Sequence, residues 1–334
     1  MQLPHVTPRR FLRITQVTVV LVVLNVVTGA AVRLSDSGLG CPDWPTCSRT
    51  RLTPALALHP VVEFGNRMVV VVLCVAALVT VLAALARAPR RGDLTGLSAG
   101  LVGGIVAEAV LGAVVVYSKL NAYVVMVHFL VGMALLTVAV VLALRAGRAA
   151  ADSPPVRMAT PGTVRAGRLV LAVLALAVAA GTATTGAGPH AGGKGAKRVP
   201  VPLADMARLH SGIVLVVVAL TLGVLALLAR QGAPTRVLDR GRVLVGAMLA
   251  QGAVGYAQYF SHLPPLLVGI HVFGATVVWS AMVWFYDGLS RHRPEEAPPT
   301  APAGGTPAPA RRAGGGPAPV PGEAPAPWPE PARR

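Results

Sequence analysis

Long apolar segments, separated by short polar turns, make up most of this chain. A helix needs about 20 apolar residues to cross the hydrocarbon core of a bilayer, and eight segments meet that length. The pattern therefore predicts transmembrane helices near residues 13–33, 60–86, 94–117, 121–145, 166–186, 206–229, 240–260 and 264–287. From about residue 292 the chain is rich in Pro, Ala, Gly and Arg, which predicts a disordered tail.

One stretch of this pattern occurs twice. It runs from Gly103 to His128 and recurs at an offset of 143 residues, ending at His271. Each copy is an apolar helix, a polar turn and a second apolar helix with its histidine about two turns inside. The matching positions include Gly103 with Gly246, Ala107 with Ala250, Gly112 with Gly255, Ser118 with Ser261, Leu120 with Leu263 and Val125 with Val268.

The helices before each copy extend the repeat to four helices. The sequence Thr-Gly-Ala ends both the first and the fifth predicted helix, at residues 28–30 and 185–187. Sliding the sixth helix along the second places His210 opposite Asn66 and Ala207 opposite Glu63. Two units with an even number of helices keep one orientation, so their pseudo-twofold axis runs along the membrane normal.

The predicted fold is an all-α membrane protein built as two pseudosymmetric four-helix bundles. Residues 1–145 form the N-terminal half, 146–165 a cytoplasmic linker, 166–291 the C-terminal half and 292–334 the tail. The composition agrees with this class, because 54% of the residues are hydrophobic and only 13% are charged.

The net charge of +17 raises the question of a nucleic-acid partner, but its distribution argues against one. With the N-terminus inside, most Lys and Arg residues fall on cytoplasmic stretches, which is the positive-inside bias of membrane proteins. We therefore expect a multi-pass protein of the cell membrane, with both termini cytoplasmic and the lipid bilayer as its surroundings.

Two of the three cysteines, Cys41 and Cys47, lie in the first outer loop. On the oxidising face of a membrane we expect them to form a disulfide, the alternative being two reduced surface thiols. Cys74 lies in the second helix, where a small core residue is expected.

Polar residues inside a membrane are costly and mark functional candidates. They are Glu63, Asn66, Arg67, Glu108, His128, Arg208, His210, Gln251 and His271. The three histidines and Asn66 share one depth, near the outer face. His210 and His271 come from different helices at matching depth and suit the axial ligation of a haem iron, although a lone membrane histidine is more often structural or part of a proton path.

The N-terminal half has a single histidine, His128, at this depth. Glu63 and Asn66 lie three residues apart and share one helix face. A carboxylate in a low-dielectric site can exchange protons near neutrality, which suggests a catalytic role for Glu63. The alternative is a structural ion pair with Arg67. Glu108 and Gln251 occupy matched positions, which favours a packing or hydrogen-bond role.

These motifs together resemble the haem A synthase family. The resemblance rests on GLGCPDWPTC, EFGNR, TGAGPHAGG, RLHSGI and IHVFGA, and it covers roughly residues 13–287. It implies oxidation of the C8 methyl of haem O to a formyl group, with water as oxygen source, which gives haem A for cytochrome oxidase. It also implies haem B as cofactor on His210 and His271, haem O as substrate on His128, and Glu63 as the catalytic carboxylate.

One position departs from the family. Many members have a second N-terminal histidine where this chain has Asn66, and Asn is a poor iron ligand. We therefore expect His128 alone to hold the substrate iron. Arg67 and Arg208 are candidate partners of haem propionates, the alternative being ordinary interfacial side chains.

Two other functions compete with the enzyme. A dihaem b-type electron-transfer protein would need four histidine ligands, and a parallel-repeat transporter would need a site near the midplane with broken helices. The partners that an enzyme of this kind implies are a haem O synthase, an electron acceptor and a second copy of the chain in a homo-oligomer.

Overall fold

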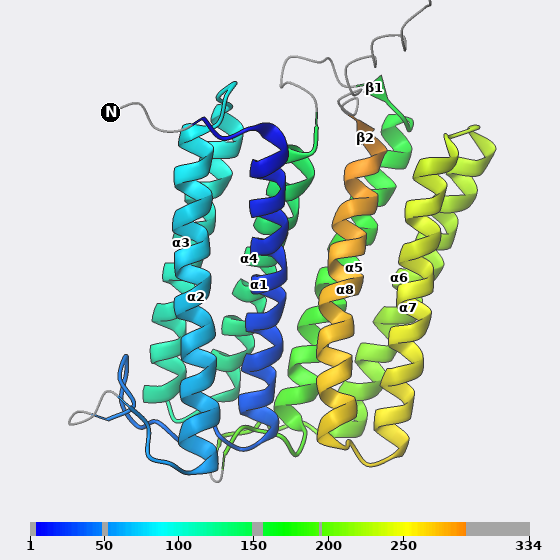
Figure 1. Cartoon of the computed structure of the whole chain (residues 1–334). Helices are drawn as coiled ribbons and strands as arrows, with labels where there is room; N and C mark the ends of the chain where they lie inside the picture. Colours follow the sequence, from blue (N-terminus) through cyan, green and yellow to red (C-terminus); the bar gives the residue numbers. More distant parts are fainter. Residues whose placement is uncertain (1–4, 49–52, 149–155, 194–195, 292–334) are drawn as a thin grey trace, which may run out of the picture. The chain divides into compact units, whose positions relative to one another are not determined.

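The computed structural model describes residues 5–48, 53–148, 156–193 and 196–291 (Figure 1). Within them run eight long helices: α1 (Pro8–Leu34), α2 (Leu58–Ala86), α3 (Gly92–Tyr117), α4 (Ala122–Ala146), α5 (Pro161–Ala187), α6 (Leu203–Arg230), α7 (Thr235–Phe260) and α8 (Pro265–Leu289). Two short strands, β1 (Val156–Arg157) and β2 (Ser290–Arg291), pair antiparallel. The prediction of eight helices is thus confirmed. The predicted tail, residues 292–334, lies outside the described residues.

Seven of these eight helices are long and apolar enough to cross a membrane. The eighth, α7, carries Arg236, Asp239, Arg240 and Arg242 in its first turns, which lower its mean hydropathy. After these charges α7 continues from Val243 to Phe260 without a charged residue.

Three helices, α1, α5 and α7, begin five residues earlier than their apolar segments predict, at residues 8, 161 and 235 against 13, 166 and 240. Thr7 and Thr160 act as N-caps of α1 and α5, since each side chain accepts a backbone N–H of the first turn, and each is followed by Pro at the first helical position. Residues 161–165, predicted as linker, are therefore helical. Capping chemistry extends a helix beyond the apolar stretch that the membrane requires.

The turns that follow α3 and α7 have the same conformation. Lys119 and Leu120 have φ values of 52° and 60°, and His262 and Leu263 have values of 65° and 61°. Left-handed conformations are uncommon for residues with a Cβ. The two turns of the repeated stretch therefore share this uncommon backbone conformation.

The helices pack mainly as sequence neighbours, and four of them meet in the middle. The extensive pairs are α1 with α2, α3 with α4, α5 with α6 and α7 with α8. Contacts between the halves come from α1 with α8, α4 with α8 and α4 with α5. One apolar core lies among α5–α8, and a second lies among α1–α4 and includes Val283 of α8.

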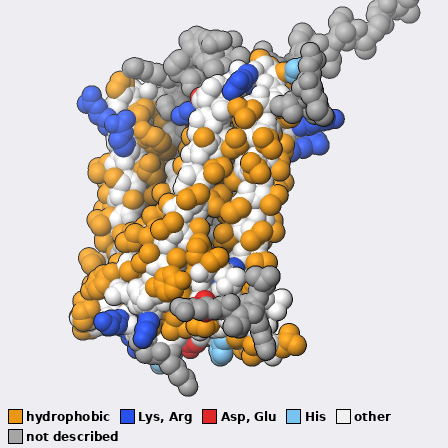
Figure 2. Space-filling view, turned by 90° about the vertical axis from the view of Figure 1, so that its left-hand side faces the viewer, with side chains coloured by type: hydrophobic (Ala, Val, Ile, Leu, Met, Phe, Trp, Pro, Cys, Tyr) orange, Lys and Arg blue, Asp and Glu red, His pale blue; other side chains and the backbone are white. Residues whose placement is uncertain are grey.

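Charged side chains gather at the two ends of the helices, and hydrophobic side chains cover the helices between them (Figure 2). We call the end with the α1–α2 loop the loop end and the opposite end the arginine end. At the loop end, Arg33 of α1 donates hydrogen bonds to the backbone oxygens of Thr185 and His190, at 2.9 and 2.6 Å. These bonds tie the two halves together beside the candidate site.

Candidate functional site

Two histidine rings lie close together in the C-terminal half. His210 of α6 and His271 of α8 have ring centroids 6.4 Å apart and planes at 81° to each other. An imidazole nitrogen binds a metal at about 2.0–2.1 Å and lies roughly 1.1 Å from its ring centroid, so two imidazoles on opposite sides of one metal have centroids about 6 Å apart. The observed separation therefore fits two ligands of a single iron.

The ring of His210 is anchored through one nitrogen only. Its Nδ1 lies 2.9 Å from the backbone oxygen of Ala177 on α5, so Nδ1 carries the proton and Nε2 keeps its lone pair. Metal-binding histidines commonly use their second nitrogen in this way. His271 is held through its backbone, because the Gln251 side chain of α7 donates to its carbonyl oxygen at 2.7 Å.

Glycines make room for both rings. A Cβ at Gly181 of α5 would lie 3.0 Å from Cε1 of His210, and a Cβ at Gly255 of α7 would lie 3.1 Å from Cε1 of His271. Both distances are tighter than ordinary contact, so these positions favour glycine. In the N-terminal half, a Cβ at Gly112 would lie 3.9 Å from Cε1 of His128, which is ordinary contact.

In the N-terminal half, an acid lies beside the histidine. Nδ1 of His128 on α4 is 3.3 Å from Oε2 of Glu108 on α3, at a geometry that falls short of a hydrogen bond. The matched pair of the C-terminal half differs, because the amide of Gln251 can donate to a carbonyl and a carboxylate cannot. Both residues thus contact the helix that carries the histidine, and of the two Gln251 forms a hydrogen bond to it.

Asn66 lies on α2, and its side-chain oxygen accepts a hydrogen bond from Thr28 of α1 at 2.7 Å. This bond fixes the amide of Asn66 toward α1. The position that corresponds to His210 is therefore filled here by a residue whose oxygen is already bonded within the protein.

Glu63 lies one turn nearer the loop end and is buried, with 5% of its surface exposed. Its Oε2 accepts a hydrogen bond from the backbone N–H of Cys41 at 2.7 Å, and its Oε1 accepts one from Nη2 of Arg67 at 2.6 Å. The ion pair with Arg67, which is the alternative to a catalytic role, is thus formed within α2. Both of its residues also bond to the backbone of the α1–α2 loop. The predicted disulfide between Cys41 and Cys47 is present in the same loop.

The two arginines proposed for propionates have different surroundings. Arg67 donates to the backbone oxygens of Cys41, Asp43, Pro45 and Thr46 at 2.8–3.3 Å as well as to Glu63. Arg208 of α6 is 80% exposed and pairs with Asp205 at 3.2 Å. For both residues the propionate contact stays a prediction. Cys74, predicted to be in the core, is exposed on α2.

Comparison with known proteins adds a family. A family profile described as cytochrome oxidase assembly protein matches residues 12–60 and 56–192, which is more than half of the chain. The chain is 36% identical over 106 residues to a heme A synthase of Geobacillus thermodenitrificans and 34% identical over 108 residues to one of Geobacillus kaustophilus. This chain belongs to the haem A synthase family.

The coverage of these relatives is partial. Each alignment takes in 31% of this chain, and the chain spans about a third of the length of the haem A synthases it matches, 33% and 32%. A third haem A synthase, from Shewanella oneidensis, is 56% identical over 32 residues, 10% of each chain. The residues matched by the family profile include Glu63, Asn66 and His128 and end before His210.

Several contacts of the site are not predicted by the sequence. The carbonyl of Ala177 anchors His210, and a carbonyl carries no sequence signal. Thr28 belongs to the Thr-Gly-Ala sequence that recurs at residues 185–187, and nothing in that sequence indicates that its hydroxyl binds Asn66. Gly181 lies in an alanine-rich helix, where a glycine that costs helix stability could have been recognised as a space for a ring.

Proposed function

We propose that this protein is a haem A synthase, which oxidises the C8 methyl of haem O to a formyl group for the biogenesis of aa3-type cytochrome oxidase. The family supports this function. The observation that carries it is the inequality of the halves, since one holds two imidazoles at 6.4 Å and the other holds one imidazole with the carboxylate of Glu108 beside it.

The proposed cofactor site is the pair His210 and His271, with haem B as the group that they hold. The centroid separation and the free Nε2 of His210 support ligation from both sides. When bound, haem B supplies an electron acceptor for the oxidation. The chain's own contribution is to fix both rings, through Ala177 and through the glycines beside them.

The proposed substrate site centres on His128. Asn66 is engaged with Thr28 and is a poor iron ligand, so we assign the binding of the haem O iron to His128 alone. Oε2 of Glu108 is 3.3 Å from Nδ1 of His128, so a small side-chain rotation would let it accept a hydrogen bond from Nδ1–H. Nε2 would then be left for the iron. A single protein ligand suits a group that must enter as substrate and leave as product.

Glu63 is the proposed proton acceptor. Converting a methyl to a formyl group with water as oxygen source releases protons and electrons in equal number, so a base is needed near water. Glu63 is buried but lies at the loop end, where its Oε2 bonds the loop backbone at Cys41. To accept a proton, the carboxylate must exchange its bond to Cys41 or to Arg67.

We further propose that the eight helices all span the cell membrane as two pseudosymmetric four-helix bundles, residues 1–145 and 166–291. Exchanging α1 with α5 and α4 with α8 maps each contact between the halves onto another such contact, which supports a twofold relation. The location of most arginines at one end supports cytoplasmic termini and an outer loop end. A haem O synthase, an electron acceptor and a second copy of the chain are the proposed partners.

A purified preparation tests the function. We expect the full-length protein to show a low-spin haem spectrum and, when supplied with haem O, to yield extractable haem A. A spectrum of two b-type haems with no conversion would identify a dihaem electron carrier instead. A preparation that binds no haem would overturn both and favour a transporter.

A further inference from the structure

An apolar groove of about 410 Å³ runs between the two halves of the protein. Residues of α4 from Leu130 to Val141 line one side of it, and Ala175 and Val178 of α5 with Trp279 of α8 line the other. Its volume lies in the range of small-molecule sites, about 300–1,000 Å³. The groove is on the side of α4 opposite His128, because two residues along a helix turn about 200°.

The few polar atoms of this groove are bonded within the protein. The indole N–H of Trp279 donates to the hydroxyl of Thr137 at 2.8 Å, and that hydroxyl donates to the backbone oxygen of Met133 at 3.0 Å. Neither side chain therefore needs a polar ligand. The lining favours a hydrocarbon chain.

The groove leads to a positive charge. Arg145 follows Val141 by four residues and so lies one turn further along the same face of α4. Its side chain is 42% exposed, and its ion pair with Asp93 is long, at 3.9 Å. From Leu130 to Val141 the groove extends for about 16 Å along α4, close to the half-thickness of about 15 Å that one leaflet of a bilayer core provides.

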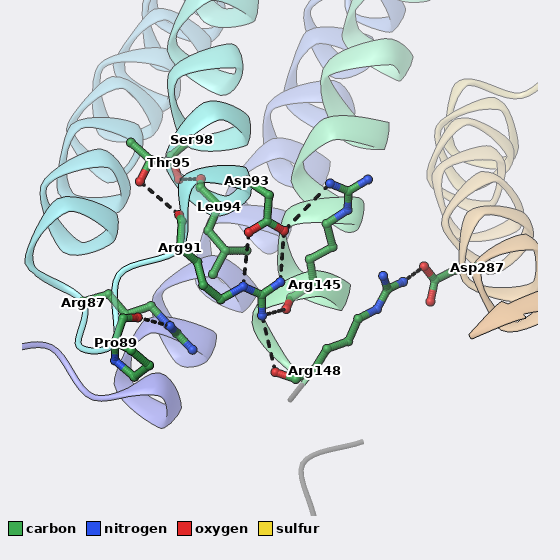
Figure 3. A network of polar contacts seen from close by, with 10 residues as sticks. All are labelled: Arg87, Pro89, Arg91, Asp93, Leu94, Thr95, Ser98, Arg145, Arg148 and Asp287. Carbon is green, nitrogen blue, oxygen red and sulfur yellow. Dashed lines mark hydrogen bonds and ion pairs between the residues drawn. The ribbon is translucent and has the colours of Figure 1, made fainter. Parts of the chain in front are cut away.

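Among the described residues around this end of the groove, arginines outnumber carboxylates. Asp93 is shared by Arg91 and Arg145, and Asp287 of α8 pairs with Arg148 (Figure 3). Asp287 also pairs with Arg240, at 3.7 Å. Each carboxylate thus faces two guanidinium groups. These six described side chains together carry a net positive charge, which an anion would offset.

The pKa of Arg148 is affected by the neighbouring arginines. Burial, and then the nearby positive charges of Arg145, Arg91 and Arg240, lower the pKa of its guanidinium below the usual value. Its bond to Asp287 crosses from the N-terminal to the C-terminal half. The positive cluster therefore lies, like the apolar groove, at the boundary between the two halves, which we call the seam.

We propose that this seam binds one anionic phospholipid, with an acyl chain in the groove and the phosphate beside Arg145 and Arg148. Basic clusters between transmembrane helices commonly take acidic headgroups. An apolar slot of leaflet depth that ends in excess guanidinium groups matches both parts of such a molecule. The lipid would fill the space between α4, α5 and α8 and join the halves.

The test measures phosphatidylglycerol and phosphatidylcholine binding to the full-length protein by native mass spectrometry in detergent. We expect phosphatidylglycerol to bind more tightly, and Arg145→Gln to weaken its binding about fivefold with phosphatidylcholine unchanged. Arg242→Gln is the control, because Arg242 of α7 is also exposed at the arginine end, 68% against 42% for Arg145, and pairs with Asp239. That variant should bind both lipids as the wild type does.

A second variant tests the chain separately from the phosphate. Ala134→Phe projects into the groove and should weaken the binding of both lipids, while the helical circular dichroism stays unchanged. Equal binding of the two lipids by the wild type, or an unchanged affinity in Arg145→Gln, would overturn the proposal. Full displacement of phosphatidylglycerol by inorganic phosphate would also overturn it, since the site would then hold a free anion without an acyl chain.

Discussion

The two halves place a histidine at the same point of their last helix and surround it differently. His271 has a second imidazole, that of His210, at a centroid distance of 6.4 Å. His128 has Glu108 beside its ring, and Asn66 stands at the position that corresponds to His210. The same helix arrangement can thus offer an iron two neutral ligands or one.

The partners behind the rings differ as well. In the C-terminal half they are neutral: the carbonyl of Ala177 for His210, and the amide of Gln251 for the backbone of His271. In the N-terminal half the corresponding partner is an acid. We propose that one half holds its group permanently and that the other exchanges it.

Removing both C-terminal histidines should break the comparison most strongly. We expect the His210→Ala, His271→Ala double variant to lose its bound cofactor haem completely, because neither imidazole of the proposed cofactor site remains. Absorption and paramagnetic resonance spectra measure the loss. Supplied with haem O, this variant should show no bis-histidine signal, and a persisting one would contradict ligation by His128 alone.

Exchanging the acid behind His128 should have a smaller effect, confined to one half. We expect Glu108→Ala to weaken haem O binding by about 10- to 100-fold, the usual cost of losing the partner of a metal-binding histidine. Gln251→Ala is the matched control and should leave haem O affinity unchanged. Titration of each purified variant with haem O checks both. Equal weakening in the two variants would show that the difference between Glu108 and Gln251 has no role.

The glycines beside the rings should give the smallest difference. A Cβ at position 255 would lie 3.1 Å from the His271 ring, whereas a Cβ at position 112 would lie 3.9 Å from the His128 ring. We expect Gly255→Ala to shift the cofactor haem spectrum and to lower the midpoint of thermal unfolding by a few degrees, as overpacking does. Gly112→Ala should match the wild type in both measurements.

The helices could be predicted closely because the bilayer demands long apolar segments and the chain supplies them. The starts of α1 and α5 were predicted too late, since Thr7-Pro8 and Thr160-Pro161 are capping signals outside the apolar stretch. The disulfide of the loop end followed from its oxidising location and is confirmed. The helices and the disulfide could both be predicted, because they follow from general physical rules that act on short stretches of sequence.

The contacts of the site were harder to predict. The sequence raised both roles of Glu63, but the four backbone carbonyls that bind Arg67 depend on how the α1–α2 loop folds back. The anchoring of His210 depends on a carbonyl of α5, which only the packing of α5 on α6 brings into reach. Backbone acceptors of this kind leave no mark on residue identity.

The most direct test concerns Glu63, measured beside its ion-pair partner. Haem A formation and the cofactor haem spectrum should be recorded together for the wild type, Glu63→Ala and Arg67→Ala. We expect Glu63→Ala to keep the cofactor spectrum and to lose haem A formation by about 100-fold or more, the usual share of a catalytic base, while Arg67→Ala loses less. A normal haem A yield in Glu63→Ala, or an equal loss in Arg67→Ala, would contradict a catalytic role for this carboxylate.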